Sequence, residues 1–254
     1  MKGSFLLSSR AFHWCKLYLI CAWEFTFCGS KTENMKSVIL IAWLGYFATP
    51  GCAQDPAGAQ PAAPTSTQQV GGRCEGCEAI HESPVPFHSL PWTDTLPGFS
   101  EPGPKMVISG IVYKADGKTP AKDVVLYVYQ TDQAGNYVNK NQETGWGARH
   151  GYIRGWVKTN ENGQYRFYTL KPASYPNTTA VKHIHPIIKE PGINEYWIDE
   201  FVFDDDPFLT VALRKENQQR GGDGVIKLKK VNGILVGERN IYLGKNIPGY
   251  PKEN

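Results

Sequence analysis

Cysteine is scarce in this chain once the N-terminal region is set aside. Of six cysteines in 254 residues, four lie in residues 1–54, and Cys74 and Cys77 alone remain beyond them, in the order Cys-Glu-Gly-Cys. Such a pair fits half a zinc site, a redox pair or a tight disulfide. Zinc needs about four ligands and no second pair follows, while a redox pair expects a βαβ context that the sequence lacks. We therefore expect a local disulfide, formed in an oxidising compartment.

An excess of either charge is also missing from most of the chain. Five of the 27 Lys and Arg and two of the 24 Asp and Glu lie in residues 1–54, which leaves 22 of each sign beyond them. A neutral body excludes nucleic acid and an anionic membrane surface as the main partner.

No apolar run reaches the length that a membrane-spanning helix needs. Residues 38–48 are apolar but too short to cross a bilayer comfortably; Met35-Lys36 precedes them and small residues follow. This pattern predicts a leader or signal region over residues 1–54, in which residues 1–34 are either untranslated or part of a long leader. We expect export to the periplasm, to a membrane as a lipoprotein, or out of the cell. Lipidation of Cys52 and cleavage after Ala53 both fit this pattern, and we expect any membrane tether to be at the N-terminus only.

Short strands punctuated by turns predict an all-β domain over residues 73–254, after a flexible linker at 55–72 that is rich in Ala, Pro and Gln. We expect an antiparallel β-sandwich with at most one short helix, at 210–217. Asn162-Gly163 and Asn232-Gly233 are hairpin signals. The strand at 124–130 is apolar on both faces, which indicates a central strand. The predicted strands are 105–113, 124–130, 156–159, 164–170, 197–203, 225–230 and 234–243.

The candidate chemistry centres on His183-Ile184-His185. Residues two apart on a strand face the same side, so both imidazoles can reach one metal, although two surface histidines fit the same pattern. Pro186 suits a strand edge or a bulge near a site. Upstream, a proline-flanked loop restricts Tyr175. Two phenolates and two imidazoles suit Fe(III) better than zinc or magnesium, although the histidine pair alone also fits copper or zinc.

Residues 155–185 resemble the core of the intradiol ring-cleavage dioxygenases, such as protocatechuate and catechol dioxygenases. The resemblance rests on Thr-Asn-Glu-Asn-Gly-Gln-Tyr-Arg-Phe at 159–167, Thr-Leu-Lys-Pro at 169–172, Tyr-Pro at 175–176 and the histidine pair. Residues 129–137 resemble the strand that carries the first tyrosine of the family, and the similarity extends over about residues 104–245.

The resemblance implies a β-sandwich with a mononuclear, non-haem Fe(III) site that cleaves a catechol-type ring with O2 to a muconate-type product. It implies Tyr137 and His185 as equatorial ligands and Tyr175 and His183 as axial ones, with Tyr175 also taking up a proton as a catalytic residue. Tyr152 is the rival to Tyr137. Families with this fold assemble variously, so a homo-oligomer fits as well as a monomer.

One departure from the family pattern concerns positive charge. The family has Arg-Pro-Ala before the histidine pair, where this chain has Ala180-Val181-Lys182. We take Arg149 as the candidate that supplies this charge, and Arg154 as an ordinary solvated side chain. The alternative hypothesis is a non-catalytic exported module that keeps the fold, with or without the metal.

Two further groups have a functional and a structural interpretation. The acidic run at 204–206 fits either a calcium loop or a solvated turn, and lacks the spaced ligands of the former. Trp146, Tyr152 and Trp156 fit either a substrate pocket or core packing.

Overall fold

Extended segments dominate the computed structural model, which describes residues 69–140 and 142–252. The chain divides into two units, Met1–Ala59 and Gln60–Asn254, and every described residue belongs to the second. The predicted leader and most of the predicted linker lie outside the described residues, so export and lipidation stay predictions. None of the helices among the described residues has the length and hydrophobicity of a membrane span.

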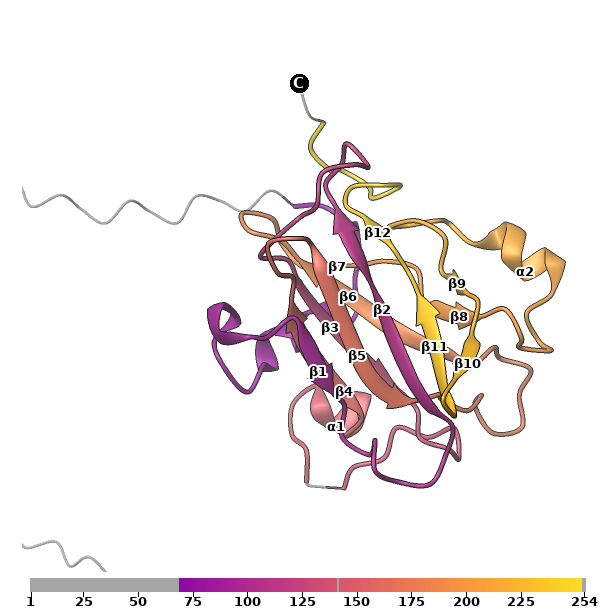
Figure 1. Ribbon diagram of the computed structural model, residues 1–254. Helices are drawn as coiled ribbons and strands as arrows, with labels where there is room; N and C mark the ends of the chain where they lie inside the picture. Colours follow the sequence, from indigo (N-terminus) through magenta and orange to yellow (C-terminus); the bar gives the residue numbers. More distant parts are fainter. Residues whose placement is uncertain (1–68, 141, 253–254) are drawn as a thin grey trace, which may run out of the picture. The chain divides into compact units, whose positions relative to one another are not determined.

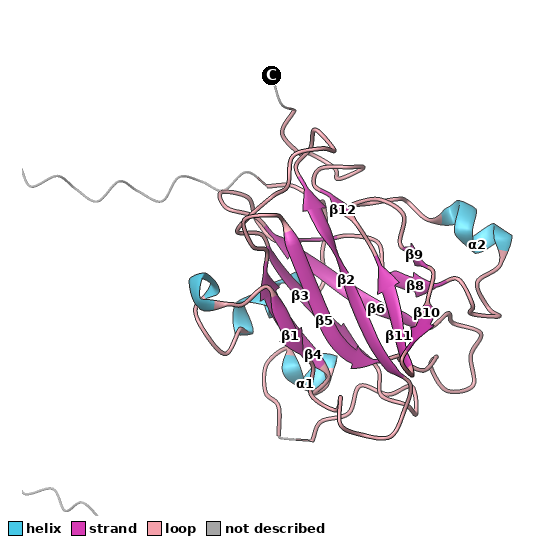
Figure 2. Cartoon of the chain, in the orientation of Figure 1, coloured by secondary structure: helices cyan, strands magenta, loops and turns pink. Residues whose placement is uncertain are grey.

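The described residues form two six-stranded sheets, which lie as two layers (Figures 1 and 2). The first sheet has the order β1-β5-β2-β11-β10 with β12 beside β2, and the second has the order β4-β3-β6-β8-β9 with β7 beside β6. The strands are β1 (Thr93–Thr95), β2 (Lys105–Tyr113), β3 (Val125–Gln130), β4 (Arg154–Lys158), β5 (Gln164–Leu170), β6 (His183–Lys189), β7 (Tyr196–Trp197), β8 (Phe201–Phe203), β9 (Val225–Ile226), β10 (Lys229–Val231), β11 (Ile234–Glu238) and β12 (Ile241–Tyr242).

The predicted β-sandwich is confirmed, but its sheets are mixed rather than wholly antiparallel. β1 runs parallel to β5, β11 and β12 run parallel to β2, and β9 runs parallel to β8. Hairpins force antiparallel pairing, whereas strands that meet after a long connection are free to pair in either direction. The Asn232-Gly233 hairpin forms as predicted, between β10 and β11.

The second predicted hairpin, at Asn162-Gly163, is wrong. A turn does form there, with Gly163 at φ 67° and its N–H donating to Asn160 O at 2.9 Å. However, β4 and β5 on either side of the turn belong to different sheets. The chain crosses from one layer to the other because Val157 and Phe167 both bury their side chains between the layers.

Helices are short, and the described residues contain more of them than the single one expected. They are the 3-10 helices η1 (Cys77–Glu82) and η2 (Phe87–Ser89) and the α-helices α1 (Gly147–His150) and α2 (Val211–Glu216). The predicted helix at 210–217 corresponds to α2, and Thr210 caps it by accepting from the Leu213 N–H at 3.2 Å.

Two apolar clusters result from the alternation of side chains along β3. Leu126 and Val128 face the main core between the sheets, while Val125 and Tyr127 face outward into a second cluster covered by η1. β3 lies between β4 and β6, so the prediction of a central strand is confirmed. Burying one such Leu or Val contributes about 1.5–3 kcal/mol, so both faces of the second sheet stabilise the fold.

The predicted linker ends earlier than Gly72. Val70 is buried in the main core, and its N–H donates to Asn194 Oδ1 at 2.7 Å. The Gly71 N–H donates to Pro248 O at 2.7 Å. A single apolar residue in a polar stretch gave no periodic signal, which is why composition placed this boundary too late.

Candidate metal centre

The two histidines project from the outer face of the second sheet at the start of β6. Ile184 and Ile188 point the other way into the main core, so the two-residue period of the strand sets the orientation of His183 and His185. Their Nε2 atoms lie 3.0 Å apart. His183 is buried and His185 is partly exposed.

The two predicted tyrosines reach the histidines from separate loops. Tyr137 follows β3 and Tyr175 lies between β5 and β6. The loops touch where Thr131 Oγ1 donates to Ala173 O at 2.7 Å. Gly135, at φ 81°, packs so closely that a Cβ there would lie 2.0 Å from Ser174 O. Only glycine therefore allows the two tyrosine loops to meet in this way.

Four ligand atoms converge at this point. Tyr137 Oη lies 2.8 Å from Tyr175 Oη and 2.9 Å from His185 Nε2, and Tyr175 Oη lies 3.0 Å from His183 Nε2. Ligands at right angles on a metal with bonds of about 2.0–2.1 Å are separated by about 2.9 Å. The spacing of this group therefore fits one bound cation.

The protonation pattern of the histidines also fits a cation. His183 Nδ1 donates to Val181 O at 2.7 Å, and His185 Nδ1 lies 3.1 Å from Glu200 Oε1. With these protons on Nδ1, both Nε2 atoms present lone pairs to each other at 3.0 Å. Each of these lone pairs lies within hydrogen-bond distance of a tyrosine hydroxyl, and all four atoms can bind one cation instead, so the donor set suits a metal ion.

Burial keeps the site neutral in the absence of added charge. Burial and the hydrogen bond with Tyr175 raise the pKa of Tyr137, and burial raises the pKa of Tyr175. Burial also lowers the pKa of His183, which favours the neutral, metal-binding imidazole. A hard cation would reverse the tyrosine pKa shifts by direct coordination to the phenolic oxygens.

Glu200 is a functional candidate that the sequence reasoning missed. On β6, Ile184 pairs with Phe201 of β8 and Ile187 pairs with Trp197 of β7. The three residues 198–200 therefore lie opposite two residues of β6, His185 and Pro186. This bulge explains why the strand tolerates Pro186, as predicted, and it brings Glu200 to the Nδ1 side of His185. Burial alone would raise the pKa of Glu200, but the hydrogen bond to His185 and both imidazoles hold it below its usual range.

Among the described His, Cys, Asp and Glu side chains, His183, His185 and Glu200 form the one group with metal-ligand spacing. Glu200 contacts Nδ1 of His185, whereas the four-atom group contains Nε2 of that ring. Glu200 is therefore placed to orient His185 and not to join the four ligand atoms.

An aromatic stack supports the same histidine. Tyr129 lies between His150 and His185, with ring centroids 3.7 Å and 4.5 Å away. His150 Nδ1 is 2.8 Å from the Tyr127 hydroxyl, and burial lowers the pKa of His150 to about 4. His150 is therefore neutral at pH 7, and the stack restricts rotation of the His185 ring.

A cavity of about 440 Å³ opens beside this stack. Tyr129, His185 and Pro186 line it together with residues of α2 and of the segment around Cys74, and His185 is the one member of the four-atom group in its lining. The volume lies within the range of small-molecule sites. The cavity can therefore bring a ligand to His185.

The structure places the rival tyrosine elsewhere. The Tyr152 hydroxyl lies 2.9 Å from Lys140 Nζ and 3.1 Å from Glu101, outside the four-atom group. Tyr152 and Trp156 are buried, and Trp146 packs against the second cluster, so the core-packing interpretation of these aromatic residues is confirmed.

The arginine candidates are engaged in ion pairs. Arg149 Nη2 lies 2.7 Å from Glu75 Oε1 on the surface, outside the four-atom group, so its catalytic role stays a prediction. Arg154 is not an ordinary solvated side chain, because it is mostly buried and pairs with Glu82 at 2.6 Å.

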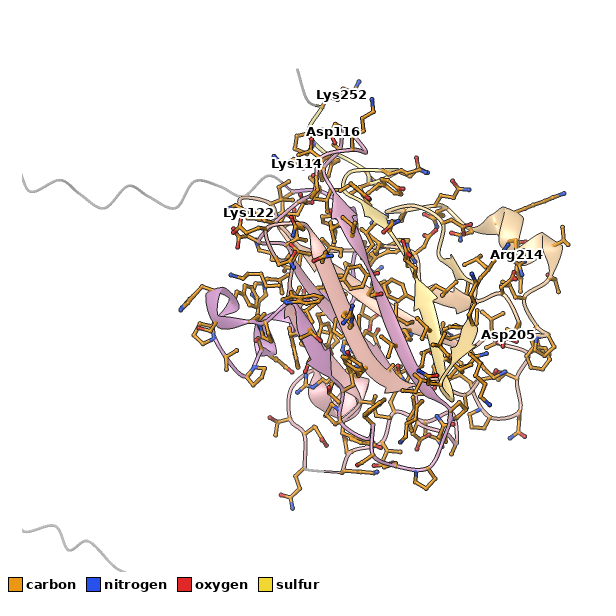
Figure 3. All side chains as sticks on the ribbon, viewed as in Figure 1. Lys114, Asp116, Lys122, Asp205, Arg214 and Lys252 are labelled. Atoms are coloured by element: carbon orange, nitrogen blue, oxygen red, sulfur yellow. A yellow bond between two sulfur atoms is a disulfide. The ribbon has the colours of Figure 1, made fainter. Side chains whose placement is uncertain are left out.

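The acidic run at 204–206 is a solvated turn only in part. Asp205 is exposed (Figure 3). It pairs with Lys171 at 2.6 Å. Asp206 is buried instead, and its carboxylate accepts from the Lys182 N–H at 2.7 Å and the Phe208 N–H at 2.9 Å. Asp206 thus fixes the backbone immediately before His183, a role that no pattern in the sequence indicates.

Comparisons with known proteins find dioxygenases. Residues 91–221 match the model of a protein family described as dioxygenase. A stretch of 113 residues is 29% identical to the protocatechuate 3,4-dioxygenase beta chain of Burkholderia cepacia, covering 42% of this chain and 48% of that protein. The chain thus matches about half the length of this curated relative.

Solved structures with a similar fold include two dioxygenases. The dioxygenase domain of a dioxygenase and carbohydrate-binding protein fusion from Streptomyces sp. SirexAA-E is 23% identical, with a TM-score of 0.44, covering 57% of this chain and 82% of that one. Catechol 1,2-dioxygenase from Acinetobacter sp. ADP1 is 17% identical, with a TM-score of 0.47, covering 65% and 63%.

Proposed function

Because the chain belongs to the intradiol ring-cleavage dioxygenase family, we propose that it is a ferric, non-haem dioxygenase that cleaves a catechol-type ring with O2. The observation that carries the proposal is the convergence of two tyrosine Oη and two histidine Nε2 atoms at separations of 2.8–3.0 Å. Tyr137, Tyr175, His183 and His185 would hold the iron. Two phenolates and two neutral imidazoles match the hardness and charge of Fe(III).

The protein's own groups would prepare the substrate. When bound, Fe(III) would supply Lewis acidity and a template for the two substrate oxygens. As the phenolate that a bound cation would stabilise, Tyr175 Oη could accept the proton that a catechol hydroxyl loses, because it sits on a loop and lies within hydrogen-bond distance of Tyr137 and His183. Glu200 and the Tyr129 stack hold His185 in place.

The test is the colour and turnover of the purified full chain. Iron-loaded protein should show a tyrosinate-to-iron absorption band, and the band should shift when catechol is added. It should consume one O2 per catechol, since both oxygen atoms enter the diacid product. A protein that stays colourless and iron-free after iron reconstitution contradicts the proposal, and metal analysis separates iron from copper or zinc.

Two substitutions assign the ligands. Tyr175→Phe should alter the band and slow turnover while the fold is kept; an unchanged spectrum removes Tyr175 from the ligand set. His185→Ala should lose iron, and full retention of iron removes that residue. Tyr152→Phe is the matched control, because its hydroxyl lies outside the four-atom group.

A second candidate function rests on Ala180, which occupies the position of the family's arginine. In this case the protein is a non-catalytic exported binding module that keeps the fold, with or without the metal. Iron-coloured protein that turns over no catechol in a broad panel would favour this function.

We also propose export, which the disulfide between Cys74 and Cys77 supports, since such bonds persist in oxidising compartments. Cell fractionation of the full chain tests this: we expect it in the extracytoplasmic fractions, and cytoplasmic protein contradicts export.

A further inference from the structure

Arg239 is a buried cation that lies between β11 and β12 of the first sheet, with only 3% of its surface exposed. Its backbone is fixed on two sides, because its N–H donates to Ser109 O at 2.9 Å and its carbonyl accepts from the Tyr165 hydroxyl at 2.7 Å. Gly110 packs so closely that a Cβ there would lie 1.9 Å from the Arg239 carbonyl oxygen. The first sheet therefore holds this residue firmly.

The guanidinium of Arg239 reaches the backbone of the second sheet. Its Nη1 donates to Asp199 O at 2.8 Å and to Glu200 O at 3.2 Å. These two residues belong to the bulge opposite His185 and Pro186, which the pairing of β6 with β7 and β8 leaves out. A buried carbonyl needs a hydrogen-bond donor, and here one guanidinium supplies it to two carbonyls in succession. Arg239 thus fixes the bulge from across the sandwich.

The charge of Arg239 is costly to bury. Burial lowers the pKa of the guanidinium, against the field of the nearby Asp199 carboxylate. An apolar side chain of similar volume would avoid this cost, but it would leave the two carbonyls of the bulge without their donor. The benefit of an arginine at this position is therefore the fixed geometry of the bulge.

The backbone position of Glu200 decides whether its side chain reaches His185. The contact between Glu200 Oε1 and His185 Nδ1 is 3.1 Å long, so a small displacement of the bulge would weaken it steeply. Gly224 packs on the same carbonyl, because a Cβ there would lie 2.3 Å from Glu200 O and 3.0 Å from Arg239 Nη1. The Glu200 carbonyl is thus held between a guanidinium and a glycine.

We propose that Arg239 is a positioning residue of the metal centre, which acts on His185 through Glu200. In the described part of the chain, none of its hydrogen bonds reaches one of the four ligand atoms. The contacts run from the Arg239 guanidinium to the Glu200 backbone, and from the Glu200 carboxylate to His185 Nδ1. The inference rests on the proposed function, because it concerns the affinity of the same centre for iron.

A double-mutant cycle on the full chain tests the inference. Arg239→Lys keeps the charge but replaces the planar fork with a single ammonium, which cannot serve both carbonyls in the same geometry. We expect it to weaken iron binding about threefold to tenfold in a titration with a competing chelator, because Glu200 is displaced but not removed. In a Glu200→Ala background the same substitution should change iron affinity by less than about twofold, since the contact through which it acts is already absent.

Two further measurements keep the test independent of one variant and of iron. Gly224→Ala should push Glu200 O away from Arg239 and weaken iron binding, again only while the Glu200 carboxylate is present. Nitrogen-15 NMR of the iron-free full chain at pH 7 reports on the contact directly. The Nδ1 proton of His185 should exchange faster with water in Arg239→Lys, as it should in Glu200→Ala.

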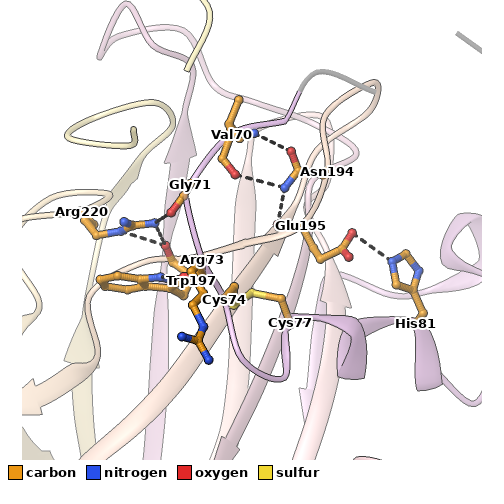
Figure 4. The surroundings of a disulfide bond; sticks show 10 residues. All are labelled: Val70, Gly71, Arg73, Cys74, Cys77, His81, Asn194, Glu195, Trp197 and Arg220. Carbon is orange, nitrogen blue, oxygen red and sulfur yellow. Dashed lines mark hydrogen bonds and ion pairs between the residues drawn. A yellow bond between two sulfur atoms is a disulfide. The ribbon is translucent and has the colours of Figure 1, made fainter. Parts of the chain in front are cut away.

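Arg220→Lys is the matched control. Arg220 is also 3% exposed and donates to backbone carbonyls, to Gly71 O at 3.0 Å and to Trp197 O at 2.9 Å, while it stacks over the Trp197 ring (Figure 4). Its side chain does not hold the Glu200 carbonyl. We therefore expect Arg220→Lys to lower the midpoint of urea unfolding as Arg239→Lys does, but to keep wild-type iron affinity.

Three results would overturn the inference: wild-type iron affinity in Arg239→Lys, an equal loss with and without the Glu200 carboxylate, or the same coupling to Glu200 in Arg220→Lys. Failure of the proposed function gives a different result. In that case wild-type protein itself binds no iron and shows no visible band, while the exchange of the His185 Nδ1 proton still reports whether Arg239 positions Glu200.

Discussion

Glu200 offers a sharp test of how the fold supports the metal centre. Its Oε1 lies 3.1 Å from His185 Nδ1, on the ring edge away from the four converging atoms. The substitution Glu200→Gln keeps the length of the side chain and an oxygen that can accept the Nδ1 proton, but it removes the negative charge. Glu200→Ala removes both the charge and the acceptor.

The expected loss follows from this geometry. Removing a group that orients a metal-ligating histidine costs about 10–100-fold in metal affinity. The contact is at the long end of hydrogen-bond distances, and 43% of the Glu200 side chain is exposed, so solvent screens its charge. We therefore expect Glu200→Gln to weaken iron binding about tenfold, or about 1.4 kcal/mol, and Glu200→Ala to weaken it further.

The assay is a titration of iron-loaded protein with a competing chelator at pH 7, followed by the visible band. Glu195→Gln is the matched control, because Glu195 makes the same kind of contact with His81, also at 3.1 Å, on the surface away from the metal centre. We expect wild-type affinity for this control.

The reasoning is refuted if Glu200→Ala binds iron as tightly as wild-type protein, because the orientation of His185 would then not depend on Glu200. A drop of equal size in Glu195→Gln would also refute it, since the effect would then reflect overall charge.

Three further changes test other parts of the site. Tyr129→Leu should weaken iron binding about threefold to tenfold by removing the stack on His185, while Tyr129→Phe should not; equal affinities of the two variants contradict this role. Wild-type protein should lose about 2 kcal/mol of unfolding free energy between pH 7 and pH 5 from His150, whose folded pKa of about 4 lies below its ordinary value of 6.5. This contribution is complete above pH 6.5 and is lost as the pH falls toward 4, so urea unfolding of His150→Asn should show a smaller pH dependence than that of the exposed-site variant His88→Asn. Asp206→Ala should cost about 2 kcal/mol in urea unfolding, because it leaves the backbone N–H groups of Lys182 and Phe208 without their acceptor; an unchanged midpoint contradicts this role.

Local patterns in the sequence predicted the scaffold well where strand identity depends on neighbouring residues. The strands 105–113 and 164–170 have the predicted bounds, and the cap at Thr210 marks the start of α2. The partner of each strand was harder to predict. β4 and β5 are consecutive in the chain but lie in different sheets, because burial of Val157 and Phe167 outweighs the turn signal between them.

The same division applies to the candidate site. A two-residue period and a proline-bounded loop suffice to nominate His183, His185 and Tyr175, and the family resemblance adds Tyr137. Glu200 and Asp206 could not be nominated, because their roles depend on a bulge between β6 and its neighbours and on a buried turn. Neither feature leaves a periodic signal, and an acidic residue after an apolar strand most often faces solvent.

Metal binding and turnover depend on different parts of this site, which narrows the choice between the two candidate functions. The four converging ligand atoms suit a cation whatever residue occupies position 180. Ala180 bears only on the negative charge that develops on the substrate. A non-catalytic protein with this donor set would therefore still bind metal. Metal binding alone does not distinguish the two candidate functions, and the deciding property is whether a positively charged side chain contacts the bound substrate.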